Sequence, residues 1–304
     1  MKMVTIQKKR GKYLITEVCD CMNENISSIQ TTLYIVSTPI GNLGDISYRA
    51  IETLEMVEKI YAEDTRLSRK LLHHYDIKTP LYSFHKYNEK GRLFNIIEDL
   101  KEGKSVALIS DAGTPLISDP GENLIHELIQ LGFNVRHIPG PTAYISGLIL
   151  SGLQTSPNLF YGFLPAKKVA REKTLSNLKD LPYTLIFYEA PHRIQDTIAS
   201  LKKVLKNRNV SLLRELTKKF ETHYHFNLQD TIDFSDFKGE IVLVVEGKKT
   251  QPNFHKDDLI EHVKLNIADG LSEMEAIKKV AKLRNMKKND VYMAFTDYKS
   301  TKGE

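Results

Sequence analysis

The hydrophobic positions between residues 33 and 138 form two kinds of run that alternate along the chain. Short apolar runs typical of buried strands lie at residues 33–37, 59–62, 106–110 and 134–138. Apolar residues at helical spacing lie at residues 47–57, 67–74 and 89–101 and in a segment that begins at Glu122. This alternation predicts an α/β domain with a mostly parallel sheet covered by helices on both faces.

A second block begins after Pro157-Asn158 and repeats the pattern less regularly. Its predicted strands are residues 184–188, 210–215 and 239–245, and its predicted helix is residues 194–205. Residues 221–226 alternate polar and apolar side chains, as a half-exposed strand does. We therefore expect a second α/β domain with a mixed sheet.

After residue 252 the pattern indicates short helices only, at residues 259–268, about 272–283 and 289–295. Gly270 ends the first of these, and Ser272-Glu273-Met274-Glu275 is a capping box that opens the second. The expected organisation is a flexible extension (residues 1–31), an N-terminal α/β domain (32–156), a C-terminal α/β domain (157–249) and a small helical tail, loosely like a helix-turn-helix (250–304).

Composition and charge limit the class of protein. The 304 residues are 41% hydrophobic and 27% charged, with a formal net charge of +5. These values are ordinary for a globular protein and allow an anionic partner through local patches. Cys19 and Cys21, the two cysteines of the chain, fit a reducing compartment. No apolar run approaches the roughly 20 residues of a membrane span, and no export signal is visible, so we expect a cytoplasmic protein without a membrane partner.

The most informative loop is residues 110–121, Ser-Asp-Ala-Gly-Thr-Pro-Leu-Ile-Ser-Asp-Pro-Gly, which follows a predicted strand. It is longer than a plain connection needs. Pro115 and Pro120 stiffen it, and its glycines let backbone approach a ligand closely. Loops at the carboxyl ends of strands border the ligand crevice of an open α/β sheet. The alternative is a polar strand–turn–helix connection that binds nothing.

Four other predicted strand ends carry polar or rigid residues, at residues 38–47, 62–66, 138–143 and 187–193. The first contains glycines but neither a dinucleotide nor a Walker fingerprint. The second sets two carboxylates beside Arg66, and the third is a Pro-Gly-Pro turn. The fourth brings Glu189, His192 and Arg193 to one edge, as a site for an anionic ligand would. A capped turn, a solvated ion pair and a rigid corner are the alternatives.

Metal-dependent and covalent catalysis are not expected. Cys19-Asp20-Cys21 has no second cysteine pair, the histidines lack ligand spacing, and there is no G-x-S-x-G elbow. Two basic clusters remain, Lys167, Lys168, Arg171 and Lys173, and in the tail Lys278, Lys279, Lys282, Arg284, Lys287 and Lys288. Charge runs are usually solvated faces, but these two could follow a phosphate backbone.

Taken in order, these segments resemble the tetrapyrrole-methylase-like (class III) methyltransferases that use S-adenosylmethionine (SAM), and among them the RsmI branch, which methylates small-subunit ribosomal RNA. The resemblance covers about residues 32–296. It rests on residues 38–43, 62–66, 110–121, 139–141, 162–165, 187–193 and 214–218.

The resemblance implies two α/β domains with SAM in the cleft between them, and a homodimer. It also implies transfer of a methyl group to the ribose 2′-oxygen of a cytidine at the decoding centre of 16S rRNA, in the small ribosomal subunit. Carried over residue by residue, the SAM contacts are Pro39, Ile40, Gly41, Asn42, Asp111, Ala112, Gly113, Thr114, Ile117, Pro139, Gly140, Pro141, Thr142, Phe163, Leu164, Glu189, Ala190 and Pro191.

A ribose hydroxyl is a poor nucleophile, so a general base would help. Asp64, Asp111, Glu189 and His192 are candidates, with Asp64 or Glu189 preferred, although both could instead be structural partners of the arginines. RNA contacts are expected from Arg66, His192 and Arg193 and from the six basic residues of the tail.

Two other functions stay open. One is a class III methylase for a small tetrapyrrole such as a precorrin. The other is a non-catalytic RNA-binding protein on the same scaffold. In the tetrapyrrole branch the segment that corresponds to residues 111–121 has a different Gly-Asp-Pro pattern, which disfavours a porphyrinoid substrate.

Overall fold

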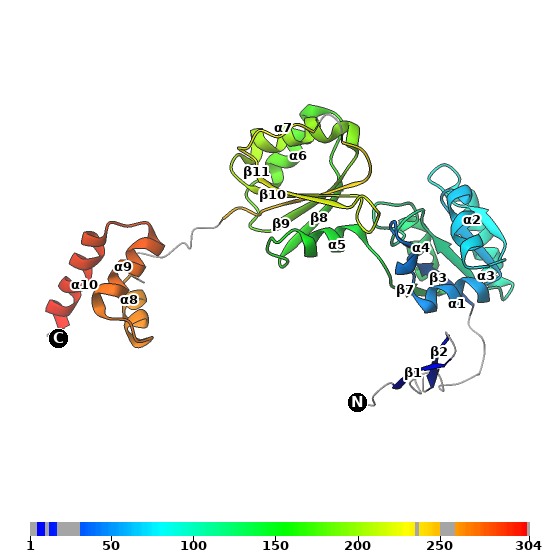
Figure 1. The fold of residues 1–304 in the computed structure, drawn as a ribbon, viewed down its shortest axis with the longest axis horizontal. Coiled ribbons are helices and arrows are strands. Elements are labelled where there is room, and N and C mark those ends of the chain that lie inside the picture. Colours follow the sequence, from blue (N-terminus) through cyan, green and yellow to red (C-terminus); the bar gives the residue numbers. More distant parts are fainter. Residues whose placement is uncertain (1–4, 10–11, 17–30, 235–236, 250–258, 303–304) are drawn as a thin grey trace. The chain divides into compact units, whose positions relative to one another are not determined.

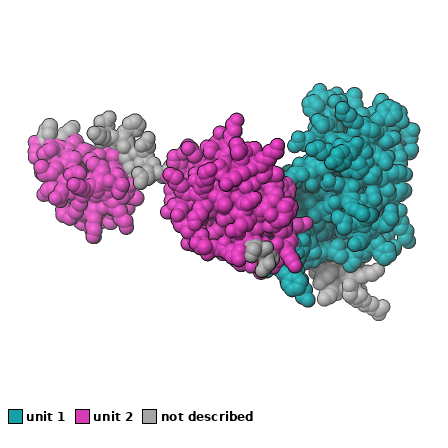
Figure 2. All heavy atoms as spheres, turned by 90° about the horizontal axis from the view of Figure 1, so that it is seen from above, with its two compact units in different colours: residues 1–146, 215–221 teal, residues 147–214, 222–304 magenta. Residues whose placement is uncertain are grey.

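The computed structural model describes residues 5–9, 12–16, 31–234, 237–249 and 259–302. The chain divides into two compact units (Figure 2). Unit 1 consists of Met1–Ser146 and Glu215–Glu221, and unit 2 of Gly147–Arg214 and Thr222–Glu304. The predicted domain boundaries stay predictions.

Unit 1 contains a five-stranded sheet, in the order β5-β4-β6-β3-β7, whose neighbouring strands are all parallel. Figure 1 labels two of these strands, β3 and β7. The strands are β3 (Thr32–Val36), β4 (Lys59–Ala62), β5 (Leu81–Ser83), β6 (Val106–Ile109) and β7 (Asn134–Ile138). The inner strands β4, β6 and β3 are buried on both faces. Their continuous apolar runs are what such a doubly covered sheet requires.

Four helices cover this sheet: α1 (Tyr48–Met56), α2 (Thr65–His74), α3 (Glu89–Lys101) and α4 (Glu122–Gln130). A short 3₁₀ helix, η1 (Leu43–Asp45), precedes α1. Helices α1 and α2 pack on the sheet face that contains Ile109, and α3 and α4 pack on the face that contains Leu108. Strand β6 lies between β3 and β4, yet its following helix covers the opposite face from theirs. The loops therefore part at the carboxyl ends of these strands, which is where open α/β sheets bind ligands.

Unit 2 contains a mixed sheet in the order β11-β10-β12-β9-β8. Its strands are β8 (Asn158–Phe163), β9 (Thr184–Glu189), β10 (Asn209–Arg214), β11 (Thr222–Asn227) and β12 (Ile241–Val245). β8 and β9 are parallel, and β12 is antiparallel to both β9 and β10. β10 therefore runs in the same direction as β8 and β9. Register pairs Ile241 with Glu189 on one side and with Arg214 on the other, so the ends of β9 and β10 meet at one edge.

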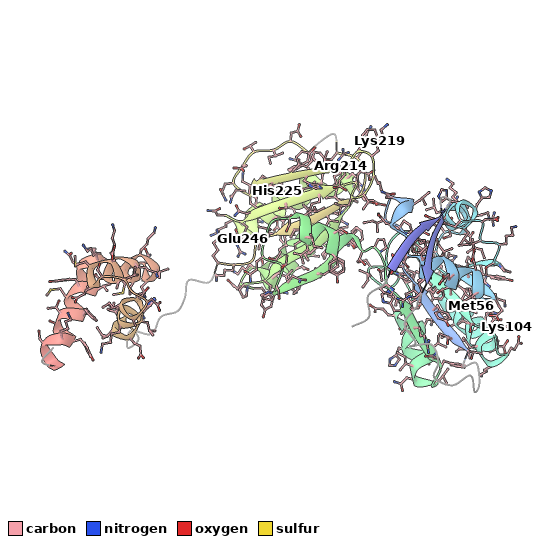
Figure 3. The ribbon with its side chains drawn as sticks, turned by 60° about the horizontal axis from the view of Figure 1, so that its bottom comes forward. Met56, Lys104, Arg214, Lys219, His225 and Glu246 are labelled. Atoms are coloured by element: carbon pink, nitrogen blue, oxygen red, sulfur yellow. The ribbon has the colours of Figure 1, made fainter. Side chains whose placement is uncertain are left out.

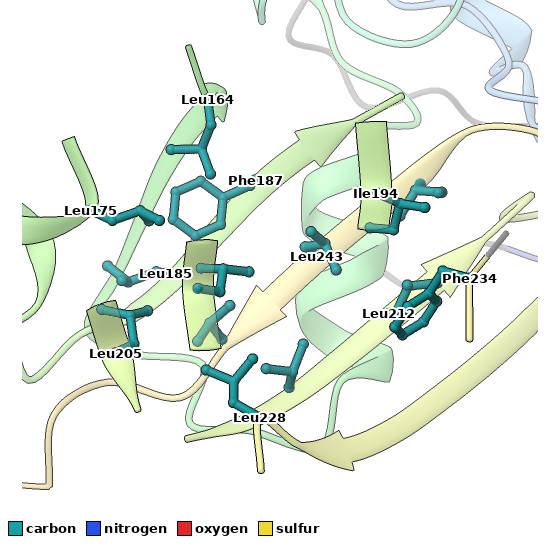
Figure 4. Close-up of a cluster of buried hydrophobic side chains, with 14 residues drawn as sticks. Leu164, Leu175, Leu185, Phe187, Ile194, Leu205, Leu212, Leu228, Phe234 and Leu243 are labelled. Atoms are coloured by element: carbon teal, nitrogen blue, oxygen red, sulfur yellow. The ribbon is translucent and has the colours of Figure 1, made fainter. Parts of the chain in front are cut away.

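The core of unit 2 lies between the sheet and two helices, α6 (Lys168–Leu178) and α7 (Ile194–Leu205), the latter preceded by η2 (Pro191–Arg193). Figure 4 shows Leu185, Phe187 and Leu243 of the sheet within this apolar cluster. Helix α5 (Ala143–Leu150) packs on the other face. A Cβ added to Gly147 would lie 2.7 Å from Cγ1 of Val242, so glycine is required for α5 to approach β12 this closely.

The tail has its own apolar core and three helices, α8 (Leu259–Ala268), α9 (Glu273–Arg284) and α10 (Lys288–Lys302). The predicted capping box is confirmed, since the backbone N–H of Ser272 donates to Oε2 of Glu275 at 3.1 Å. The third helix extends well beyond the predicted residues 289–295. None of the helices among the described residues is long and apolar enough to cross a membrane.

The predicted α/β class is confirmed, and several elements were located closely: strands 59–62 and 134–138 and helices 89–101 and 194–205 have the predicted bounds. Strands β5 and β8, helices α5 and α6 and the antiparallel pair β1 (Thr5–Lys9) and β2 (Lys12–Thr16) were missed. β5 has only three residues, and α5 is apolar almost throughout, so neither shows a period. The pair lies in the segment predicted to be a flexible extension. Residues 1–4, 10–11 and 17–30 of that segment lie outside the described residues.

Candidate functional site

Three of the predicted loops meet at the carboxyl edge of the unit 1 sheet. Thr38, just after β3, and Gly113, in the loop after β6, exchange two backbone hydrogen bonds of 2.8 and 3.1 Å. A Cβ on Gly113 would lie 3.1 Å from Cγ2 of Ile40 and 3.6 Å from the carbonyl oxygen of Pro141. The loops that follow β3, β6 and β7 are therefore in contact at this edge.

A chain of hydroxyl groups holds these loops together. Oγ of Ser37 and Oγ1 of Thr114 lie 2.9 Å apart. Oγ1 of Thr114 lies 2.7 Å from that of Thr142 and 3.1 Å from the carbonyl oxygen of Pro141. Ser37 also contacts Nε2 of His137 at 3.2 Å. Ser37 and His137 were not among the predicted site residues, because neither belongs to a loop motif.

The loop after β6 has an unusual backbone. Leu116 and Ser118 have φ values of 75° and 72°, and Gly113 and Gly121 have 86° and 125°. Non-glycine residues with positive φ are uncommon and carry strain. Such strain clusters at ligand sites, so it agrees with the functional interpretation of residues 110–121.

Asp111 has a structural contact of its own. Its Oδ1 accepts a 2.8 Å hydrogen bond from the backbone N–H of Asp64, which links the loop after β6 to the end of β4. Asp64 in turn begins α2 as its N-cap and accepts hydrogen bonds from the backbone N–H and the guanidinium of Arg66. The Arg66 hydrogen bonds lower the pKa of Asp64 to about 2. The Arg66 side chain is 86% exposed.

Two further carboxylates lie near Asp111. Burial and the neighbouring charge of Glu63 raise the pKa of Asp119 to about 6, although a hydrogen bond with Ser110 acts in the opposite direction. Burial and Asp111 likewise raise the pKa of Glu63. Glu63 and Asp119 were not among the predicted site residues. Their positions in the sequence could have identified them, because Glu63 directly follows β4 and Asp119 lies in the loop after β6.

The predicted turn at residues 39–42 is partly a capped turn. Pro39 and Ile40 are buried, whereas Gly41 and Asn42 are exposed. Oδ1 of Asn42 accepts from the backbone N–H of Gly44 and thereby caps η1. A Cβ on Gly41 would clash with the side chain of Lys218. Lys218 belongs to residues 215–221, which follow β10 in the chain and are part of unit 1. The resemblance includes Lys218, but the sequence predicted no role for it.

The predicted contacts from unit 2 lie at the carboxyl ends of β8 and β9. Phe163 is 51% exposed, whereas Leu164 is 2% exposed and packs in the core of unit 2. Ala190 and Pro191 are half-buried. Arg214, labelled in Figure 3, donates to Thr222 and to the carbonyl oxygen of Lys238.

Glu189 is fully enclosed within unit 2. Its side chain is 0% exposed and accepts hydrogen bonds from the backbone N–H of Ala190 at 2.8 Å and from Oγ1 of Thr197 at 2.5 Å. Nε of Arg193 lies 3.3 Å away, and the same guanidinium donates to the carbonyl oxygen of Leu164 at 2.7 Å. Glu189 and Arg193 therefore join the loops after β8 and β9, while His192 is exposed beside them.

The two basic clusters differ in the structure. The tail residues Lys278, Lys279, Lys282, Lys287 and Lys288 are exposed, and Arg284 is half-buried with its Nε 3.3 Å from Nδ1 of His262. In the other cluster Arg171 is buried and donates to Ser200 and to the carbonyl oxygens of Ala166 and Asp196. The expectation that Arg171 could follow a phosphate backbone is therefore wrong. Within the described residues no group of three or more His, Cys, Asp or Glu side chains is arranged to hold a metal ion.

Comparisons with known proteins agree with this geometry. Residues 32–232 match the family described as Tetrapyrrole (Corrin/Porphyrin) Methylases. Ribosomal RNA small subunit methyltransferase I of Bacillus subtilis is 42% identical over 283 residues, which cover 90% of this chain and 97% of that protein. The protein of the same name from Halalkalibacterium halodurans is 45% identical, over 86% of this chain and 93% of that protein.

Among solved structures, the methyltransferase CobJ has a TM-score of 0.57 at 16% identity, over 72% of this chain and 95% of that chain. At this identity the likeness concerns the fold alone. The sequence relatives go further. This chain belongs to the tetrapyrrole methylase family and, within it, to the group of the ribosomal RNA small subunit methyltransferase I proteins.

Proposed function

We propose that this protein transfers a methyl group from SAM to the ribose 2′-oxygen of a cytidine in 16S rRNA of the small ribosomal subunit. The observation that carries the proposal is the carboxyl edge of the unit 1 sheet, where three loops of the family's motifs meet. Relatives named as ribosomal RNA methyltransferases, at 42–45% identity, support the choice of acceptor.

The residues at this edge fit SAM as a ligand. SAM is a cation at sulfur and also carries hydroxyl, amine and carboxylate groups, so it needs hydrogen-bonding loops and nearby negative charge. Asp111 is exposed, and its charge raises the pKa of both Glu63 and Asp119. Pro139 and Gly140 present exposed backbone beside the hydroxyl chain. We assign the donor site in unit 1 to the loops 39–42, 111–117 and 139–142, and we keep Phe163, Leu164 and 189–191 as proposed contacts from unit 2.

The sulfonium of bound SAM supplies an already activated methyl group, so the main task of the protein is to align donor and acceptor. Orientation of that kind can supply on the order of 7–11 kcal/mol. Asp64 is the more exposed of the two proposed bases, but a pKa of about 2 makes it a weak one. Glu189 is enclosed by its own loop. We therefore propose a positioning role for Glu189 and retain Asp64 as the candidate that can reach an acceptor.

We assign RNA contacts to Arg66, to His192 and to the exposed lysines of the tail. A second copy of the chain is the proposed cover for the outer side of α5, where Ile145 and Ile149 are 42% and 67% exposed. Substitution Ile149→Glu should then convert a dimer to a monomer in light scattering, and a monomeric wild type would contradict the homodimer. Because ribosomal subunits assemble in the cytoplasm, that is the proposed location.

The test is a methyl-transfer assay with radiolabelled SAM and three acceptors: small subunits that lack the modification, naked 16S rRNA and a precorrin. Label in RNA supports the proposal. Label in the precorrin would instead establish the small-molecule methylase, and retention of RNA without label would establish a non-catalytic RNA-binding protein.

A further inference from the structure

A turn after β5 displays a tyrosine that the site described above does not use. Tyr87 is 96% exposed, the highest value among the large hydrophobic side chains of the described residues. It lies between β5 and α3, flanked by Lys86 and followed by Lys90, both exposed. Its ring lies edge-on to that of His85 with centroids 6.2 Å apart.

The turn is held in place by hydrogen bonds at its base. The backbone N–H of Phe84, a buried residue, donates to the carbonyl oxygen of Ala62 in β4 at 2.7 Å. Oδ1 of Asn88 accepts from the backbone N–H of His85 at 2.8 Å, and its Nδ2 donates to Ser83. Asn88 is the N-cap residue of α3, yet its side chain closes this turn and does not cap the helix. Lys86 and Tyr87 are thus presented outward from a fixed base.

The position of the turn relates it to the donor site within unit 1. β4 and β5 are parallel neighbours in which Ala62 pairs with Ser83. Glu63 and Asp64 of one strand and Phe84 and His85 of the other therefore leave the sheet at the same carboxyl edge. The backbone N–H of Asp64 reaches Asp111 of the proposed SAM site at 2.8 Å. The turn and the donor loops belong to one edge of one sheet.

Charge indicates the kind of ligand. Residues 84–90 contain Lys86 and Lys90 and one acidic side chain, the half-buried Glu89. Exposed Arg66 lies at the start of the neighbouring helix. An aromatic ring between cations is how proteins bind single-stranded nucleic acid, with bases on the ring and phosphates on the cations.

We propose that residues 84–90 form a subsite for a single-stranded nucleotide that neighbours the methylated one. Tyr87 stacks on its base, and Lys86 and Lys90 contact phosphates. This inference rests on the proposed function, because it assumes that the acceptor is RNA.

The test compares Tyr87→Ala and Tyr87→Phe with Phe94→Ala, a matched control that removes a 61% exposed ring farther along α3. Three quantities are measured for each: the KM for small subunits, the Kd for a labelled single-stranded 16S rRNA fragment, and the Kd for SAM by calorimetry. Tyr87→Ala should raise both the KM for small subunits and the Kd for the RNA fragment by roughly 5- to 150-fold, which corresponds to the loss of one stacked base. Tyr87→Phe should restore them, and SAM affinity should not change.

Several outcomes would overturn the subsite. Tyr87→Ala could behave as wild type, Phe94→Ala could lose as much, or the loss could occur with assembled subunits and not with the RNA fragment, which would indicate a protein contact. A wild type that neither methylates nor binds RNA would reject the proposed function and the subsite together. If the wild type methylates RNA and Tyr87→Ala has unchanged KM and Kd values for RNA, the subsite alone is rejected.

Discussion

The two sheets gather their functional loops by different means. In unit 1 all five strands are parallel, so every loop that leaves a carboxyl end reaches the same edge. In unit 2 only β8 and β9 are parallel neighbours, and β10 shares their direction because β12 is antiparallel to both β9 and β10. A parallel sheet thus brings all such loops to one edge, whereas a mixed sheet does so only for the strands that share a direction.

The carboxylates at the two edges also differ. In unit 1 Asp111 is exposed, and Asp119 and Glu63 have raised pKa values because they are partly buried near other acids. In unit 2 Glu189 is enclosed and bound by three neighbours. The comparison indicates that the acids of unit 1 remain available to a ligand, while Glu189 stabilises its own loops.

The largest expected effect concerns Asp111. Asp111→Ala should abolish SAM binding in calorimetry, because it removes a charge from the donor site and the acceptor for the backbone N–H of Asp64. Asp111→Asn keeps that acceptor and should retain part of the affinity. Unchanged affinity in Asp111→Ala would remove the residue from the site.

The second prediction concerns the enclosed acid of unit 2. Glu189→Ala should lower the free energy of unfolding by about 3 kcal/mol, because it leaves the half-buried guanidinium of Arg193 and the backbone N–H of Ala190 without their partner. Glu189→Gln should lower the free energy of unfolding by less. Denaturant unfolding measures both. A large fall in kcat with wild-type stability would instead favour Glu189 as the base.

The third prediction tests the strained loop of unit 1 against a relaxed glycine of unit 2. A Cβ on Gly121, at φ +125°, would lie 2.9 Å from Cδ2 of Leu116, whereas one on Gly152, at φ +68°, would meet nothing within 4 Å. Gly121→Ala should therefore lower the free energy of unfolding by about 1–3 kcal/mol more than Gly152→Ala does. Equal losses in thermal or denaturant unfolding would mean that the loop after β6 is not specially packed.

The smallest effect concerns pH. The pKa of Asp119 is about 6 in the folded protein and 3.8 ordinarily, so the folded state binds its proton more tightly. Stability must then rise as pH falls from 7 to 5, relative to Asp119→Asn. Solvent screening at this partly exposed group limits the difference to about 1 kcal/mol. Urea unfolding at both pH values measures it, and a difference of opposite sign would contradict the raised pKa.

The sequence predicted the α/β class and most strands because their apolar runs are continuous, as in 106–110, or periodic, as in 194–205. It also predicted the loops after β3, β6 and β7 from their glycines and prolines. It could not predict that Ser37, Thr114 and Thr142 form one hydroxyl chain, because the two contacts of that chain join residues 77 and 28 positions apart. Nor could it separate the exposed lysines of the tail from the buried Arg171, since charge patterns do not record burial.

The most direct test of the account is the chemical identity of the product. Wild-type protein is incubated with methyl-labelled SAM and small subunits that lack the modification, and the RNA is digested to nucleosides and separated by mass. We expect the label in 2′-O-methylcytidine, and the same experiment with Asp111→Ala should give none. Label on a base, or no label in any nucleoside, would contradict a ribose methyltransferase built on the carboxyl edge of unit 1.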